Sequence, residues 1–181
     1  MSLKKLSART AEYKTIGDHP ALNQELVNGS DRVAVLLGAT IVDTHLERLL
    51  SKFFLNSAKE TKELLSSSNA SAPLSSFSAR TKIAYCLGLI EKIEFEDLNR
   101  IREIRNTFAH NLFECDFDTT SVRDALTSMH HMRHFQSEHP ELPVRGLFTL
   151  TIATLESKLT FRIQQTSARE PPFHIQPPGD A

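Results

Sequence analysis

The feature that most constrains this chain is a run of apolar residues between positions 35 and 54 that recurs at helical spacing. Its main stripe follows the 4-3-4-3-4 intervals with which one helix packs along another, and consists of Val35, Ala39, Val42, Leu46, Leu49 and Phe53. Flanking apolar residues widen this stripe, so most of the helix circumference must be buried. Ser30 stands just before the run and is a good N-cap. The pattern predicts a long central helix over about 31–54.

The rest of the chain is read as further helices around this one. With 181 residues, 40% hydrophobic and 24% charged, the chain fits a single soluble domain with its own core. In the 77–88 segment, Ser78 is the expected N-cap and Gly88 the stop. The 144–166 segment also alternates like a strand, but no partner strand is visible. We predict an all-α domain of six or seven helices, the others lying near 18–27, 58–66, 77–88, 98–112, 120–136 and 144–166.

The two ends differ in composition from the domain. Residues 1–17 are polar and are expected to form a flexible arm, the domain occupies 18–166, and 167–181 is a proline-rich tail that we expect to be disordered. No apolar run suggests a signal peptide or a membrane span. The two cysteines lack a paired spacing, which favours reduced thiols and a cytoplasmic protein.

Charge disfavours tight binding to DNA. The formal net charge is −1 and the isoelectric point is about 6.7, whereas proteins held to phosphate backbones usually show a basic excess. A local basic patch is still possible, so contacts with DNA or RNA stay open.

Polar chemistry is concentrated in the segment 98–112. Its apolar residues form one helical stripe, while Arg102, Arg105, Asn106 and His110 occupy other positions. Asn106 and His110 are four residues apart and share a face, with Arg105 at its margin. This segment is the main candidate for a functional site.

A second polar pair lies on the central helix. Asp43 and Glu47 are four residues apart at the margin of the apolar stripe, where a partly buried carboxylate needs a cation or donors. Arg102 and Arg105 are the candidate cations, which would make a binding or structural network of the four residues. A solvated face is the alternative.

No cofactor or metal site is expected. His130 and His134 have the i,i+4 spacing that can seat a metal ion, but a solvated helix face explains the same spacing. No glycine-rich phosphate loop occurs, since every glycine is isolated.

Four blocks of sequence, in order, resemble the mannitol operon repressor family: 30–40, 43–50, 76–89 and 101–110. The resemblance spans roughly 20–165. It implies an all-α fold without an obvious helix-turn-helix and a role in transcriptional repression of mannitol uptake genes.

The Arg105–His110 block is also similar to the Arg-x4-His motif of HEPN domains, many of which are metal-independent endoribonucleases that act as dimers. This similarity implies a HEPN-like helical bundle and a homodimer with the motif near its interface. Under it, Arg105 would stabilise phosphate, His110 would perform acid–base chemistry and Asn106 would orient them.

The first interpretation is therefore a non-enzymatic transcriptional regulator of the mannitol operon repressor type. It would act through a protein partner or weak nucleic-acid contacts, as a homodimer without cofactor or membrane. The alternative is a HEPN-type endoribonuclease that uses Arg105 and His110. A third interpretation is an interaction module with a purely structural role.

Overall fold

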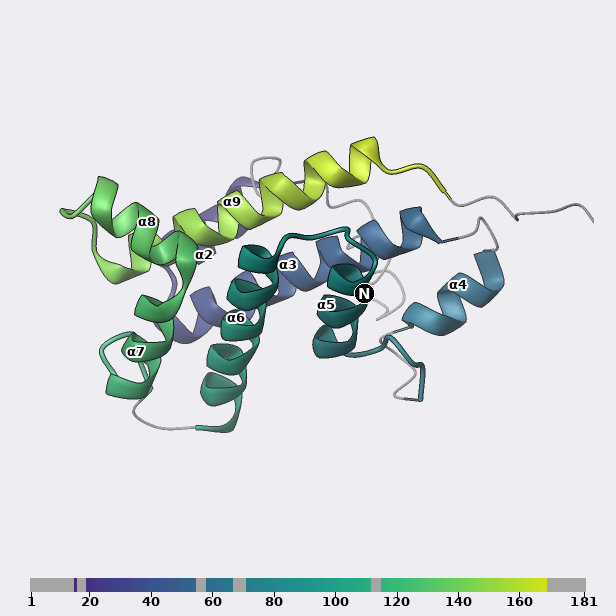
Figure 1. The fold of residues 1–181 in the computed structure, drawn as a ribbon. Coiled ribbons are helices and arrows are strands. Elements are labelled where there is room, and N and C mark those ends of the chain that lie inside the picture. Colours follow the sequence, from purple (N-terminus) through teal and green to yellow (C-terminus); the bar gives the residue numbers. More distant parts are fainter. Residues whose placement is uncertain (1–14, 16–18, 55–57, 67–70, 112–114, 169–181) are drawn as a thin grey trace, which may run out of the picture.

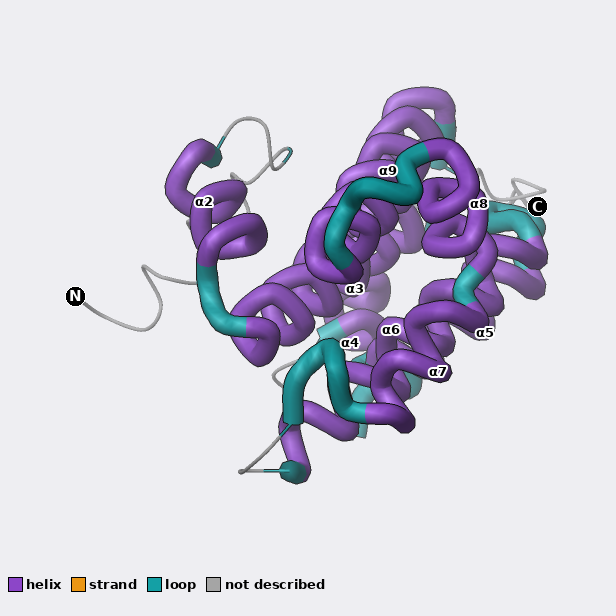
Figure 2. The backbone as a smooth tube through the Cα atoms, turned by 90° about the vertical axis from the view of Figure 1, so that its left-hand side faces the viewer, coloured by secondary structure: helices purple, strands orange, loops and turns teal. Residues whose placement is uncertain are grey.

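The computed structural model describes residues 15, 19–54, 58–66, 71–111 and 115–168, and every regular element within these ranges is an α-helix. Figure 2 shows these helices joined by short loops. The all-α prediction is confirmed, including the helical assignment of 144–166. The expected six or seven helices become eight in the described ranges. They are α2 (Pro20–Asn28), α3 (Asp31–Phe53), α4 (Ala58–Leu65), α5 (Phe77–Cys86), α6 (Lys92–His110), α7 (Thr120–Ser128), α8 (His130–Glu138) and α9 (Val144–Gln165).

Helix α3 is the central element, as predicted. It begins where Ser30 accepts a hydrogen bond from the backbone N–H of Val33, at 3.2 Å. The side chains of Val35, Leu46 and Leu49 are fully buried. Helix α9 runs lengthwise beside α3. Helices α6 and α5 pack against α3 from another side (Figure 1).

The contact between α3 and α9 is close because of a glycine. A Cβ atom placed on Gly38 would lie 2.9 Å from Cγ1 of Ile152 and 3.2 Å from Cε1 of Phe148. The same interface encloses two polar side chains, His45 and Glu156, whose Nε2 and Oε1 atoms are 3.7 Å apart. The two helices are therefore held by tight apolar packing around a buried polar pair.

Several helix ends differ from the predicted ones. The N-cap of α5 is Ser76, which accepts from the N–H of Ala79 at 3.2 Å, and not Ser78. Helix α6 begins at Lys92, earlier than expected, because Glu91 and Glu94 form a capping box there. Gly88 does lie in the left-handed region after α5, with φ +68°.

The single helix predicted over 120–136 is wrong, since it is divided at Met129 into α7 and α8. The cause is Asp97 of α6, whose carboxylate accepts from the N–H groups of His130 and His131 at 2.7 and 3.0 Å. A side chain from a distant part of the sequence thus supplies the cap that starts α8.

The predicted arm and tail lie outside the described residues, apart from positions 15, 167 and 168. Cys86 and Cys115 are both free thiols. None of the helices in the described ranges is sufficiently long and apolar to cross a membrane.

Candidate functional site

The C-terminal half of α6 presents the predicted polar residues to solvent. Its apolar stripe is buried as expected, with Leu98, Ile101 and Phe108 fully enclosed. Arg105 and His110 are exposed and Asn106 is partly exposed. Leu112, the last residue of the predicted helix, lies outside the described residues, and the helix ends at His110.

The side chains of Arg105 and Asn106 are joined directly. Nη1 of Arg105 donates a hydrogen bond to Oδ1 of Asn106, at 3.0 Å. The guanidinium group keeps its remaining donors on an exposed surface, where it can meet a carboxylate, a phosphate or a backbone carbonyl group. The arrangement suits recognition of an acceptor-rich surface.

The end of α6 is held in place by α3. Arg32 donates from its guanidinium group to the carbonyl oxygen of Phe108, and to that of Asn111 at 2.6 Å. Its guanidinium carbon also lies 5.9 Å from the centre of the Phe108 ring. Because these carbonyl groups flank His110, Arg32 fixes the backbone from which His110 projects. Sequence reasoning did not identify Arg32.

The Asp43–Glu47 pair is bound by Arg80 of α5, a residue to which the sequence analysis gave no role. Arg80 is 3% exposed and forms a bidentate ion pair with Asp43. Its Nε atom donates to Oδ1 at 2.8 Å, and its Nη2 atom donates to Oδ2 at 2.7 Å. Glu47 lies 3.6 Å from the same guanidinium group. Burial raises the pKa of Glu47, and the positive charge of Arg80 offsets this only in part.

Arg80 also ties a loop to the domain. Its Nη1 atom donates to the carbonyl oxygens of Leu74 and Ser75 at 2.9 and 3.1 Å. With all its nitrogen atoms bonded, this guanidinium group is an anchor between α3, α5 and the loop before α5. A periodicity signal existed in the sequence, because Arg80 shares the buried face of α5 with Ala84.

Arg102 does not complete the network that was expected around Asp43. Its Nε atom is buried and lacks a hydrogen-bond partner among the described residues. Its Nη2 atom lies 3.9 Å from Oε1 of Glu103, the neighbouring residue on α6. Arg102 therefore borders the exposed face of Arg105 and Asn106.

The histidines of α8 bind separate carboxylates. Nε2 of His130 lies 2.6 Å from Glu96, whereas His134 lies 3.4 Å from Glu138. No group of three metal-binding side chains occurs within the described ranges.

Asp97 and His131 form a buried pair that the sequence did not reveal. Nδ1 of His131 donates to Oδ2 of Asp97 at 2.7 Å, and Nζ of Lys158 lies 3.3 Å from Nε2 of the same ring. Burial of Asp97 opposes its ionisation, but hydrogen bonds from His131 and His130 outweigh this effect and hold its pKa below the usual value. These contacts join α6, α8 and α9.

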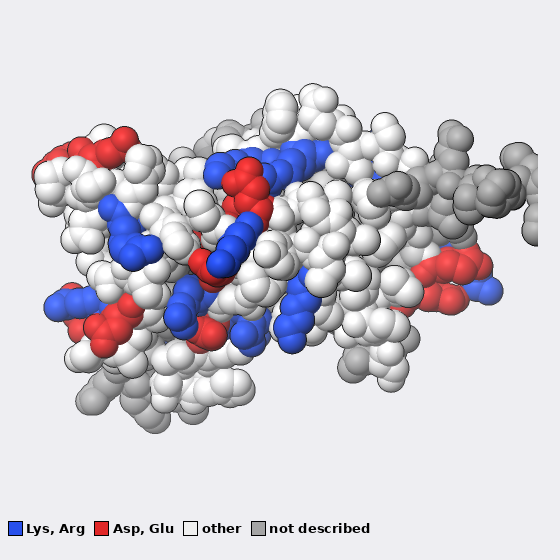
Figure 3. Space-filling view, viewed as in Figure 1, with Lys and Arg blue, Asp and Glu red and all other residues white. Residues whose placement is uncertain are grey.

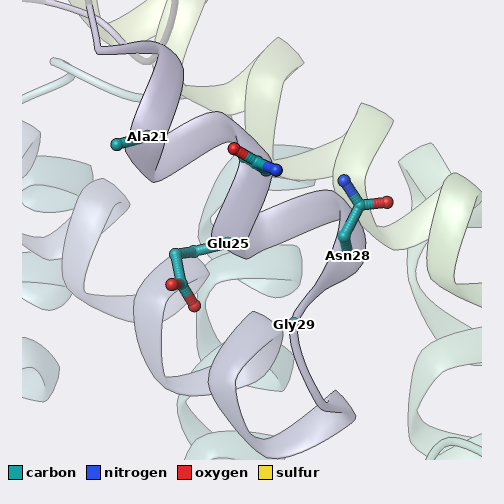
Figure 4. Close-up of a pocket in the computed structure, with 5 residues that line it drawn as sticks. Ala21, Glu25, Asn28 and Gly29 are labelled. Atoms are coloured by element: carbon teal, nitrogen blue, oxygen red, sulfur yellow. The ribbon is translucent and has the colours of Figure 1, made fainter.

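A shallow pocket lies elsewhere, along α2. Ala21, Gln24, Glu25, Asn28 and Gly29 line it, and Figure 4 shows them on one side of the helix and at its end. None of the predicted site residues contributes to it.

Comparisons with known proteins agree with the fold and with the resemblance described above. A sequence model of the mannitol repressor family matches residues 24–159. The fold is similar to that in the X-ray structure of the MtlR–HPr complex from Escherichia coli, with 19% sequence identity and a TM-score of 0.62. This similarity covers 77% of the present chain and 96% of the other. No curated protein sequence matches.

Proposed function

Because the chain belongs to the mannitol repressor family, we propose that it regulates transcription of mannitol uptake genes by binding a protein of the HPr type. The observation that carries this proposal is the combined match: the family model covers most of the domain, and a protein of the same fold was crystallised in complex with HPr. That partner is carried over to this chain as part of the proposal.

The distribution of charge supports a protein partner over direct, tight DNA binding. On the face shown in Figure 3, basic and acidic side chains alternate along the surface and do not form one broad basic area. With a net charge of −1, the chain offers little of the counterion release that drives binding to DNA.

The start of α8 is also unsuited to reading a DNA groove. Recognition helices of helix-turn-helix proteins place their N-terminal residues against base edges. In this chain, Asp97 occupies the first N–H groups of α8, and the ring of His131 is buried beside it. The α7–α8 pair therefore serves packing within the domain.

We assign the partner contact to the α6 face, defined as Arg102, Arg105, Asn106 and His110. Arginine is enriched among the residues that dominate binding energy at interfaces. Arg105 is exposed yet positioned by Asn106, so it loses less conformational freedom on binding than a free side chain would.

Calorimetric titration with HPr from the same organism tests this assignment. Arg105→Ala should weaken binding about tenfold or more, as expected for a central interface arginine. Arg123→Ala is the matched control, because Arg123 is exposed on α7 and, among the described residues, forms its ion pair with the exposed Asp118. Lack of HPr binding by the wild-type protein would refute the function, whereas equal binding by all three proteins would refute only the assigned surface.

The alternative function is a metal-independent endoribonuclease, and the exposure of Arg105, Asn106 and His110 on one helix favours it. A purified sample incubated with mixed RNA in the presence of a chelator provides the test. Under our proposal no cleavage is seen. Cleavage that is lost in His110→Ala, with the fold intact, would establish the enzyme instead, since loss of a proton-transfer group costs roughly 10²–10⁴-fold in rate.

We further propose that the protein is a homodimer, as the HEPN similarity implies. A helical domain with a small net charge faces little electrostatic repulsion between identical copies.

A further inference from the structure

Helix α9 has an uncharged outer side. Its inner side includes Ile152, Leu155 and Leu159, which are at most 2% exposed, and Ile152 lies against Gly38 of α3. The opposite side carries Leu150, Thr154, Ser157 and Phe161, called here the α9 outer face. Phe161 is 62% exposed and Leu150 is 37% exposed, so Phe161 is the most exposed large apolar side chain in the described ranges.

The absence of charge on this face is unusual for the surface of the molecule. Between Gly146 and Ser157 the only charged residue is Glu156, which is buried against His45. In Figure 3 a basic group lies over α9, whose basic side chains Lys158 and Arg162 are directed towards Glu94 of α6 and not onto the α9 outer face. A solvent-facing helix normally carries charged residues on its outer side, and exposed apolar patches mark interaction surfaces.

The spacing of these four residues is that of a helix–helix seam. Positions 150, 154, 157 and 161 are separated by 4-3-4, as are the core positions of a coiled coil. The two large side chains stand at the ends and the two small ones in the middle. A second, antiparallel copy of this helix would place Leu150 opposite Phe161 and Thr154 opposite Ser157 at every contact.

From this pattern we propose that two copies of the chain pair through the α9 outer face, antiparallel, about a two-fold axis between Thr154 and Ser157. Such a contact is isologous, so it closes at two copies. Small central residues let the helices approach, and each Leu150 packs on a phenyl ring of the other copy. The inference rests on the homodimer proposed above and replaces the α6 motif with α9 as its interface.

Electrostatics favour a second copy over a charged partner. The positions that flank the seam include Ala153 and Thr160, which are uncharged, and Lys158, whose ammonium group is engaged with Glu94 and His131. Two such faces bring no like charges together. A charged surface placed here would be desolvated without compensation.

The contact is small, and its strength sets the range of the experiment. A 22-residue helix is about 33 Å long and roughly 10 Å wide. The area of one helix face is therefore smaller than the approximately 800 Å² that each side of a standard interface provides. We therefore expect reversible association, seen as an apparent mass that rises from 20.4 kDa towards twice that value over a concentration series in sedimentation equilibrium.

Two double variants then test the interface and its direction. Leu150→Glu with Phe161→Glu places like charges at both symmetric contacts, whereas Leu150→Glu with Phe161→Lys places opposite charges there only if the helices are antiparallel. The Glu/Lys protein should associate about tenfold more tightly than the Glu/Glu protein. Val27→Glu, at another exposed apolar position, is the control and should behave as wild type. Circular dichroism verifies that each variant is folded.

Each other outcome overturns the proposal. A wild-type mass that stays at 20.4 kDa at all concentrations excludes the dimer, while HPr binding, measured separately, still decides the proposed function. A Glu/Glu variant that dimerises like wild type places the interface elsewhere. Equal behaviour of the two double variants excludes the antiparallel arrangement. If the wild-type protein is a monomer and Phe161→Glu abolishes HPr binding, the α9 outer face is the HPr site.

Discussion

The contact between Arg80 and Asp43 should be the most costly single polar interaction to remove from this fold. Replacing Arg80 with methionine keeps most of the buried aliphatic stem and deletes the guanidinium group. The two charge-assisted bonds to Asp43 contribute about 1.5–3 kcal/mol each, and the bonds to the carbonyl groups of Leu74 and Ser75 about 1 kcal/mol each. The simple sum is about 5–8 kcal/mol.

That sum must be reduced for solvent. The side chain of Asp43 is 25% exposed and that of Glu47 is 41% exposed, so both carboxylates regain water when Arg80 is removed. We therefore expect Arg80→Met to lower the free energy of unfolding by about 3–4 kcal/mol, within the range for breaking a buried ion pair. Urea unfolding followed by circular dichroism, extrapolated to water, measures this directly.

A double-mutant cycle with Asp43→Asn isolates the pair itself. The two single changes should not add, and the coupling energy should be about 2 kcal/mol or more. Arg123→Met is the control, since this exposed ion pair with Asp118 should contribute less than about 1 kcal/mol. If Arg80→Met costs less than about 1 kcal/mol, or no more than the control, the assignment of Arg80 as the anchor is refuted.

Two further changes test the packing and the buried acid. Gly38→Ala should destabilise the protein by about 1–3 kcal/mol, because its Cβ would meet Ile152 at 2.9 Å; thermal unfolding at or above the wild-type midpoint would contradict this. Asp97→Asn should cost about 2 kcal/mol at neutral pH and less in acid. The pKa of Asp97 is lowered in the folded state, so its stabilising effect is complete above the unfolded pKa of about 3.9 and is lost as pH falls through the folded value. Urea unfolding of both proteins at several pH values checks the trend, and a stability difference that grows in acid would contradict it.

The helices that were predictable from sequence are those in which apolar residues recur at helical spacing over several turns. The α3 seam repeats over several turns, so its period reports the buried face directly. Ser30 could be identified as a cap because capping depends on residues only three positions apart, as its 3.2 Å contact with Val33 illustrates. Helix α9 also kept its helical spacing, although its threonines alternate as in a strand.

Features that depend on distant residues could not be predicted. Arg80 binds a carboxylate 37 positions away, and the sequence analysis had named the arginines of α6 as the candidate cations instead. The division between α7 and α8 depends on Asp97, more than 30 positions earlier. Such contacts leave no periodic trace, because a single polar side chain satisfies groups that the chain brings together only after folding.

The choice between Ser76 and Ser78 as the cap of α5 illustrates a local ambiguity. Both serines precede the apolar positions of the helix, and the spacing alone permits either. The backbone decides: Ser76 is extended and reaches the N–H of Ala79, whereas Ser78 already lies within the first turn. A shift of two residues in the N-cap does not change which side chains are buried. The segment was therefore still correctly predicted as a helix.

The two proposed surfaces lie on different parts of the molecule, and this separation has a functional consequence. In Figure 1, α9 forms the upper edge, and α6 descends from its start near α9 to an end at the lower edge, where Arg105 and His110 lie within its last two turns. Pairing through the α9 outer face would leave both α6 faces accessible. The dimer should then bind two HPr molecules independently, with one per chain, because neither contact occludes the other. A titration that saturates at one HPr per two chains would require the second site to be blocked or altered on pairing, and the two surfaces could no longer be treated as separate.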